Sequence, residues 1–247
     1  MNIALIGYGK MGHAIEQVAV RRGHTIALRI TSANKNELNE INLRDVDVAI
    51  EFTNPAAAKE NVLQCLSAGV SAVCGTTGWN EGLSDAGRKA EELGLAFLHA
   101  SNFSVGVNIF FEINKLLASL MNGRTDYGVS IEETHHTQKK DAPSGTAITL
   151  AEQIIENIGD KKRWLLNDFN DIDAVPIIAH RVEQVPGTHK VSYSSSIDDI
   201  EIIHTAHNRE GFALGAVLAA EYIHGRTGVF GMKEVLFACG SQKNPGK

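Results

Sequence analysis

The chain lacks most of the features that mark secreted, membrane-spanning or nucleic-acid-binding proteins. Its three cysteines, Cys65, Cys74 and Cys239, form no CxxC pair, and their odd number argues against a disulfide framework. No apolar run approaches the roughly 20 residues that cross a bilayer, and the opening MNIALIGYGKMG has no signal-peptide pattern. The formal net charge of −6 argues against nonspecific nucleic-acid binding. We therefore expect a cytoplasmic protein without membrane or nucleic-acid partners, with its cysteines in the core.

Metal-ligand spacings are absent as well. The sequence has 10 histidines, but none of them belongs to an HExxH motif or a similar ligand pattern. We therefore expect no metal. What is present is a globular composition, with 43% hydrophobic and 21% charged residues. A length of 247 residues allows one large domain or two smaller ones with real cores.

Short apolar segments alternate with helical segments over the first hundred residues. Helices are predicted between the strands, and they end near residues 22, 68 and 93. This alternation predicts an α/β fold with a parallel, doubly wound sheet of the Rossmann type. The predicted strands lie at residues 2–6, 24–30, 45–53, 68–78 and 95–104.

The pattern changes after residue 104, where strands and helices stop alternating regularly. A long helix is predicted at 105–121, and a strand at 127–136 places Val129, Ile131 and Glu133 on one face. We expect an α+β second domain with a mixed sheet at 106–215, whereas residues 1–105 with 216–247 form the first domain. Further helices are predicted around 147–158 and at 212–224, and further strands at 175–183, 189–196 and 200–208.

A glycine motif follows the first predicted strand. The segment GYGKMG fits G-x-G-x-x-G, and it opens a helix, which is the context in which this motif binds a dinucleotide. Glycines there permit a tight turn and let a pyrophosphate approach the helix N-terminus. We expect cofactor contacts from Gly7, Gly9, Lys10, Met11 and Gly12.

The end of the second predicted strand bears on the choice of cofactor. Sites that prefer NAD commonly place an acid there for the ribose hydroxyls. The chain has no Asp or Glu from Gln17 to Asn36, and it offers Thr31, Ser32 and Lys35 instead. Without an acid there is no repulsion against a 2′-phosphate, so NADPH is favoured, with NADH as the alternative.

Three later turns follow predicted strands, where ligands bind in an open α/β sheet. They are EFTNP, CGTTG and SNFSVG. The last two would flank the nicotinamide end of the cofactor. The cofactor contacts expected from these turns are Phe52, Thr53, Gly75, Thr76, Thr77, Ser101, Asn102 and Phe103.

The run HHTQKKDAPSGTA combines groups that suit a small carboxylated substrate. A histidine such as His135 can move a proton near neutral pH, and Lys139 supplies a mobile positive charge. Ser144 or Thr146 can cap the following helix, whose first N–H groups can also bind an anion. His135 and His136 end a strand, so their side chains should diverge.

These motifs resemble those of the dihydrodipicolinate reductase family. The resemblance rests on GYGKMG, EFTNP, VCGTTGW, SNFSVGVN, EETHHTQKKDAPSGTA and IEIIHTAHNREGFALGAV. It implies NAD(P)H-dependent reduction of 4-hydroxy-tetrahydrodipicolinate, a cyclic dicarboxylate, and a homotetramer built by the second domain. It also implies that His135 is the general acid and that Lys139 holds a carboxylate. The residues implied as further carboxylate ligands are His136, Ser144, Gly145 and Thr146.

Two other interpretations remain. Other small Rossmann dehydrogenases of amino-acid metabolism share the N-terminal glycine motif, although the DAPSGTA helix start argues against them. A dinucleotide sensor without enzymatic activity would not need the HHxxK pattern.

The chain departs from the resembled family at two positions. It has Thr137 and Gln138 where members of that family often carry basic residues, which reduces the local positive charge.

Overall fold

The computed structural model describes residues 1–183 and 185–237, which form two compact units. Of the described residues, unit 1 contains 1–105 and 209–237, and unit 2 contains those between Gly106 and Asn208. Helix α7 (Glu210–Ile223) belongs as a whole to unit 1, so the expected boundary between residues 215 and 216 lies inside this helix. Among the described residues, no helix is long and apolar enough to span a membrane.

Unit 1 is built on a six-stranded sheet in the order β11-β5-β4-β3-β1-β2, and every neighbouring pair is parallel. The predicted parallel sheet is therefore confirmed. The edge strand β11 (Gly228–Phe230) comes from the segment that the sequence assigned to the first domain without predicting a strand there. The strands are β1 (Asn2–Ile6), β2 (Thr25–Ile30), β3 (Val48–Glu51), β4 (Ser71–Cys74), β5 (Ala96–His99) and β11 (Gly228–Phe230).

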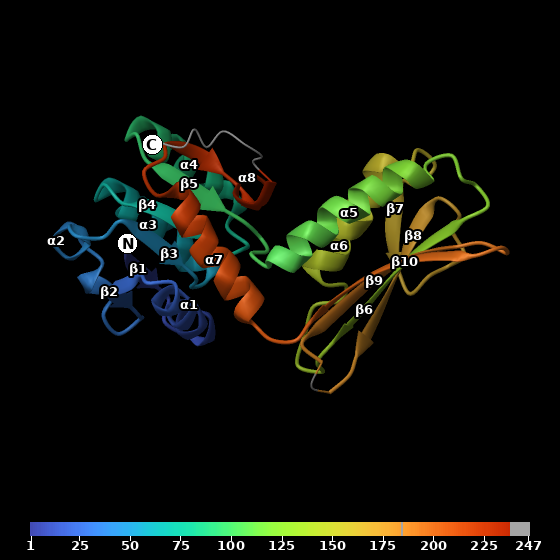
Figure 1. Cartoon of the computed structure of the whole chain (residues 1–247), viewed down its shortest axis with the longest axis horizontal. Coiled ribbons are helices and arrows are strands. Elements are labelled where there is room, and N and C mark those ends of the chain that lie inside the picture. The colour runs from blue at the N-terminus through green and yellow to red at the C-terminus, as the bar shows by residue number, and fades with distance from the viewer. Residues whose placement is uncertain (184, 238–247) are drawn as a thin grey trace, which may run out of the picture. The chain divides into compact units, whose positions relative to one another are not determined.

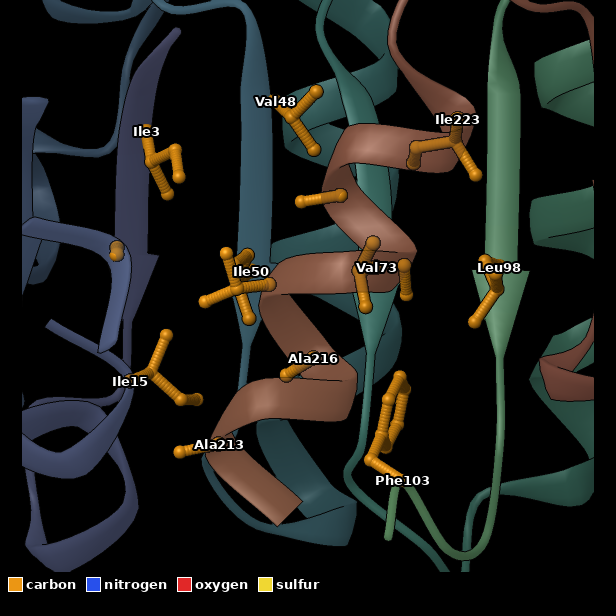
Figure 2. Close-up of a cluster of buried hydrophobic side chains, with 14 of the residues drawn as sticks. Ile3, Ile15, Val48, Ile50, Val73, Leu98, Phe103, Ala213, Ala216 and Ile223 are labelled. Atoms are coloured by element: carbon orange, nitrogen blue, oxygen red, sulfur yellow. The ribbon is translucent and has the colours of Figure 1, made fainter. Parts of the chain in front are cut away.

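Helices cover both faces of this sheet. On one face, α1 (Lys10–Arg21), α7 and α8 (Met232–Phe237) pack on apolar side chains from β1, β3, β4 and β5. Figure 2 shows Ile50, Val73 and Leu98 on neighbouring strands facing α7. On the other face lie α2 (Glu40–Leu43), α3 (Pro55–Ser67) and α4 (Leu83–Glu92). Short 3₁₀ turns, Lys35–Glu37 and Asn80–Gly82, precede two of these helices.

Local chemistry explains where these helices begin and end. Asn54 caps α3, because its side chain accepts hydrogen bonds from the N–H groups of Ala56 and Ala57, and Pro55 occupies the first turn. Gly23 follows α1 with a φ of +84°, a backbone conformation that glycine adopts without strain. Cys65 and Cys74 are fully buried, as expected, whereas Cys239 lies outside the described residues.

Unit 2 is a five-stranded mixed sheet in the order β10-β9-β6-β8-β7. Strand β6 pairs with β8 in parallel and with β9 in antiparallel orientation, which confirms the mixed sheet. Helices α5 (Val105–Met121) and α6 (Gly145–Asn157) pack on one face (Figure 1). The strands are β6 (Gly128–His135), β7 (Arg163–Leu166), β8 (Ala174–Arg181), β9 (Gly187–Ser194) and β10 (Asp199–Ala206).

Strand β6 alternates between the two faces of the sheet and ends at His135. Its residues alternate between buried and partly exposed, with Val129, Ile131 and Glu133 buried, as the sequence predicted. Strand β7 was not predicted, because the segment RWLL is short and lies at the edge of the sheet. Strands β9 and β10 form an antiparallel hairpin, and Ser195 Oγ shapes its turn by accepting from the N–H of Asp198.

Candidate active site

A cavity of about 420 Å³ lies at the carboxyl ends of β1, β2 and β3 in unit 1. This is the edge at which open α/β sheets bind their ligands. Of the residues predicted to contact a cofactor, the cavity brings together Gly7, Gly9, Thr31, Ser32, Lys35, Phe52 and Thr53. Its remaining lining residues are Ile6, Tyr8, Ile30, Asn54, Ala57 and Asn61.

The glycines of GYGKMG are required by close backbone packing as well as by ligand approach. A Cβ on Gly7 would lie 2.0 Å from the carbonyl oxygen of Phe52, and one on Gly12 would lie 2.4 Å from that of Gly7. Gly9 is different, because a Cβ there would meet nothing within 4 Å. Gly9 is also the N-cap of α1 and provides no side-chain cap, so the first N–H groups of this helix are left for an anion. Lys10 is exposed and Met11 is half-buried.

The loop after β2 holds the predicted ribose-side residues at the cavity. Asn34 fixes this loop by accepting hydrogen bonds from the N–H and hydroxyl of Thr31. Lys35 pairs with Glu60 at 2.7 Å, but both side chains are about half or more exposed, so this pair is weak and exchangeable. The described residues that line the cavity include no Asp or Glu.

A buried carboxylate supports the floor of the cavity. Glu51 is 1% exposed and accepts hydrogen bonds from the Thr53 hydroxyl, from Asn61 Nδ2 at 3.4 Å and from Cys74 Sγ at 3.0 Å. Thr53 and Asn61 both line the cavity, so the buried Glu51 orients two of the polar side chains that line it. Burial, reinforced by the same carboxylate, raises the pKa of the Cys74 thiol well above its usual range.

The remaining predicted cofactor residues do not line this cavity. Thr76 is buried and structural: its hydroxyl accepts from the N–H of Thr53, and its carbonyl accepts from Trp79 Nε1. Gly75 packs against Phe52, whose ring would lie 2.2 Å from an added Cβ. Phe103 is only 2% exposed and belongs to the core. Thr77 and Ser101 are exposed, and Asn102 is partly exposed.

In unit 2, the predicted acid His135 lies beside a buried carboxylate. Glu133 is fully buried, and its Oε2 atom is 3.5 Å from Nδ1 of His135. Its Oε1 atom accepts a hydrogen bond from Arg181 Nη2 at 3.1 Å, and its Oε2 atom accepts one from the Ser144 N–H at 3.0 Å. Glu133 therefore joins the end of β6, the end of β8 and the start of α6.

The loop that follows β6 carries Lys139 and is held by Arg181. Lys139 Nζ pairs with the carboxylate of Asp141 at 2.7 and 2.9 Å. Arg181 donates to the carbonyl oxygen of Asp141 at 2.5 Å and to that of Lys139 at 3.4 Å. Because the same guanidinium binds Glu133, the lysine loop is tied to the carboxylate beside His135.

The start of α6 is capped by Ser144, so of the two candidates Ser144 and not Thr146 is the N-cap. Its Oγ atom accepts a hydrogen bond from the Ala147 N–H at 3.2 Å and lies 3.0 Å from Nε2 of His189. Gly145 is exposed, and no heavy atom would lie within 4 Å of a Cβ there. Thr146 and His136 are partly exposed.

Burial controls the protonation of both histidines in this cluster. It lowers the pKa of His135, an effect that the neighbouring carboxylate of Glu133 opposes and that Lys139 and Arg181 reinforce. It lowers the pKa of His189 to about 3, so this ring is neutral throughout the physiological range. The two rings meet edge to face with centroids 5.0 Å apart.

Glu133, His135 and His189 also bring three possible metal-ligand atoms within 4.8 Å of one another. Two of these atoms already have partners: Glu133 Oε2 accepts from the Ser144 N–H, and His189 Nε2 lies against the Ser144 hydroxyl. The guanidinium of Arg181 is also bound to the same carboxylate. These contacts favour a hydrogen-bonded cluster over a metal site.

Sequence reasoning missed three members of this cluster. Glu133 was assigned only to the buried face of its strand, and Arg181 and His189 were read as parts of strands. A charged residue on the buried face of an amphipathic strand is a usable signal, because it needs a partner there. Nothing local in the sequence identifies that partner as Arg181, which is 48 residues away.

Family comparisons agree with this two-unit arrangement. The family model described as dihydrodipicolinate reductase, N-terminus, matches residues 1–103, and the model described as dihydrodipicolinate reductase, C-terminus, matches residues 106–236. Together these matches cover nearly all of the described chain.

Individual relatives give the same result. The chain is 51% identical over 236 residues to the 4-hydroxy-tetrahydrodipicolinate reductase of Christiangramia forsetii, covering 96% of this chain and 98% of that protein. It is 37% identical over 200 residues to that of Methanopyrus kandleri, covering 78% and 72%. A dipicolinate-bound dihydrodipicolinate reductase from Paenisporosarcina sp. TG-14 shares the fold, with a TM-score of 0.79 at 24% identity over 95% of this chain and 98% of that one. The chain belongs to the dihydrodipicolinate reductase family.

Proposed function

We propose that this protein reduces 4-hydroxy-tetrahydrodipicolinate to tetrahydrodipicolinate with NAD(P)H, a step of lysine and diaminopimelate biosynthesis. Family membership supports the reaction. The observation that carries the assignment to residues is the cluster in unit 2, where a buried histidine, a lysine loop and a helix start share the partners Glu133 and Arg181. The overall conversion consumes a hydride and a proton and releases one water.

The cavity of unit 1 fits the adenosine and pyrophosphate portions of a dinucleotide. Gly7, Gly9 and the following Lys10, Met11 and Gly12 would hold the pyrophosphate at the start of α1. Thr31, Ser32 and Lys35 would contact the ribose, and we propose that the lack of an acid there favours NADPH over NADH. The bound nicotinamide supplies the hydride. Further contacts are proposed for Phe52, Thr53, Gly75, Thr77, Ser101 and Asn102, whereas the buried side chains of Thr76 and Phe103 pack within the protein.

In unit 2, we assign the proton to His135. Loss of the 4-hydroxyl group as water gives a conjugated C=C–C=N system. Hydride addition to its terminal carbon leaves an electron pair shared between the nitrogen and the carbon next to the one that took the hydride, and this neighbouring carbon must take up a proton. The N–H bond of the His135 imidazolium breaks, its electron pair stays on nitrogen, and a C–H bond forms on the substrate. Because burial lowers the pKa of His135, the charged imidazolium is disfavoured in the free protein, and the negative charge of a bound dicarboxylate would favour it.

The substrate's carboxylates would take the positive and N–H groups of the same cluster. Lys139 is the mobile cation, and a carboxylate would compete with Asp141 for it. His136, Gly145 and Thr146 are sufficiently exposed to reach a ligand, whereas the side chain of Ser144 is buried. We propose that Ser144 acts by starting α6, so that the N-terminal end of this helix faces the anion.

A coupled assay tests the proposed function. A synthase generates the substrate from pyruvate and aspartate semialdehyde, and the loss of NADPH or NADH absorbance reports reduction. We expect His135→Gln to lower kcat by about 10²- to 10⁴-fold, with a smaller change in KM, because a proton donor acts in the transition state. Lys139→Ala should impair both parameters. Absence of turnover by the wild-type protein with either cofactor would contradict the proposed function.

We also propose a cytoplasmic homotetramer assembled through unit 2. Ile109, Ile113, Leu116 and Leu120 lie at helical spacing on α5, and they are 43%, 46%, 62% and 63% exposed. A continuous apolar stripe of this kind is typical of a surface that another chain covers. Sedimentation equilibrium should give four times the chain mass of 26.7 kDa. A monomeric wild-type protein would refute the proposed assembly.

A further inference from the structure

Glu133 is the most deeply buried charged group of the cluster in unit 2, and the proposed chemistry does not use it. Its side chain is 0% exposed on β6, two residues before His135. A carboxylate in such a place is costly unless it is paired and hydrogen-bonded. Arg181 Nη2 and the Ser144 N–H satisfy it at 3.1 and 3.0 Å. Its remaining capacity as an acceptor is directed at Nδ1 of His135.

Nδ1 of His135 lacks a hydrogen-bond partner in the part of the chain that the structure describes. The atom is buried, and among the described residues it makes no hydrogen bond, although Glu133 Oε2 lies 3.5 Å away. This separation is only a few tenths of an ångström longer than an ordinary N–H···O hydrogen bond. Hydrogen bonds of catalytic groups are often long in ligand-free proteins and tighten when the substrate binds.

The opposite edge of the His135 ring is kept open by a glycine. A Cβ on Gly187 would lie 3.0 Å from Nε2 of His135 and 3.1 Å from Cδ2, closer than ordinary van der Waals contact. The imidazole is therefore placed between a carboxylate at Nδ1 and a residue without a side chain at Nε2. This arrangement leaves Nε2 as the atom that can reach a ligand.

We propose that Glu133 is a positioning residue for His135: its buried carboxylate accepts a hydrogen bond from the Nδ1–H and so presents the Nε2–H to the substrate. This proposal rests on the proposed function, because it assigns how the acid of that reaction is held. Through Arg181 the same carboxylate also fixes the lysine loop, and through the Ser144 N–H it fixes the start of α6. Glu133 thereby positions both the proposed acid and the proposed carboxylate ligands.

Several charges surround His135, and Glu133 is the one that favours its protonated form most. Lys139 and Arg181 oppose that form, Asp141 supports it more weakly, and His189 on β9 meets the ring edge to face. Replacing Glu133 by a neutral residue should therefore lower the pKa of His135 further. The protonated acid would then be lost at a lower pH, and the descending limb of kcat/KM against pH would move in the same direction.

The test compares Glu133→Gln with Glu132→Gln in the coupled assay. Gln keeps the shape and an acceptor for the Ser144 N–H but removes the charge. Glu132 is the matched control, because it neighbours Glu133 on β6, is partly exposed and pairs with Lys190 at 2.8 Å on the other face of the sheet. We expect Glu133→Gln to lower kcat by about 10- to 100-fold and to move the descending limb of kcat/KM to lower pH by about one unit. Glu132→Gln should retain wild-type kinetics.

Binding and stability measurements separate positioning from a structural role. The dissociation constant of dipicolinate should change less than kcat, and the secondary structure should be unchanged. Wild-type kcat and pH dependence in Glu133→Gln would overturn the proposal. A lower kcat with an unshifted limb would also overturn it, since lost structure does not move an acid's titration. In either case the turnover of the wild-type protein shows independently whether the proposed function holds.

A second variant keeps the test decisive if Glu133→Gln does not fold. Removing one member of a buried ion pair leaves an uncompensated charge, here on Arg181. The double variant Glu133→Gln with Arg181→Gln removes both charges and that cost. We expect it to fold and to show the same lowering of kcat. A double variant with wild-type kcat would overturn the proposal.

Discussion

Replacing His189 by asparagine should make unit 2 less sensitive to acid. His189 is 6% exposed, and burial holds its pKa at about 3, whereas an unfolded histidine titrates near 6.5. Below pH 6.5 this histidine therefore takes up a proton in the unfolded chain, whereas it stays neutral in the folded protein. The contribution of His189 to the free energy of unfolding is therefore fully present above pH 6.5, and it is lost as the pH falls toward 3.

The slope sets the expected magnitude. One proton of difference corresponds to about 1.4 kcal/mol per pH unit, so the drop from pH 6.5 to 5 costs about 2 kcal/mol. His189→Asn removes the titrating group, and its shorter side chain also loses the 3.0 Å contact between Nε2 of His189 and the Ser144 hydroxyl, a loss that is the same at both pH values. Between pH 7 and pH 5, the variant should therefore lose about 2 kcal/mol less unfolding free energy than the wild-type protein.

Urea unfolding at both pH values, followed by circular dichroism, measures this difference. Ser144→Ala is the matched control: it breaks the same contact and removes the α6 cap, which costs about 1 kcal/mol at both pH values, but it keeps the imidazole. Its dependence on pH should therefore resemble that of the wild-type protein. Equal losses of stability in His189→Asn and wild-type protein between pH 7 and pH 5 would refute the reasoning.

Three further changes test other parts of the two sites. Asp141→Asn should lower KM for the substrate by about 2- to 5-fold in steady-state assays, because Lys139 loses an exposed partner that is worth about 1 kcal/mol or less; a raised KM would contradict this. Gly187→Ala should lower kcat more than it raises KM, because its methyl group would crowd Nε2 of His135; wild-type kcat would show that this edge is not used. Lys35→Glu should lower kcat/KM for NADPH relative to NADH, and an unchanged ratio would remove Lys35 from the 2′-phosphate site.

The fold of unit 1 could be predicted because each of its signals is local. Strand runs, the glycine turn at Gly7 and the capping pair Asn54-Pro55 lie within a few residues of the elements that they define. Strand β11 was missed, because its three residues form a strand only by pairing with β5 from a distant part of the chain. Phe103 was predicted as a cofactor contact from its position after a strand, but it packs into the core, and a sequence position alone does not distinguish these outcomes.

The cluster in unit 2 depends on the register of three strands, which no local pattern encodes. Glu133 lies opposite His189 across the antiparallel β6–β9 pair, and His135 lies opposite Arg181 across the parallel β6–β8 pair. A shift of either partner strand by one residue would turn its ionisable side chain to the other face of the sheet. A shift of β8 would leave the Glu133 carboxylate buried without Arg181, at a cost of several kcal/mol. The ion pair that positions the proposed acid therefore also selects the register in which the acid is positioned.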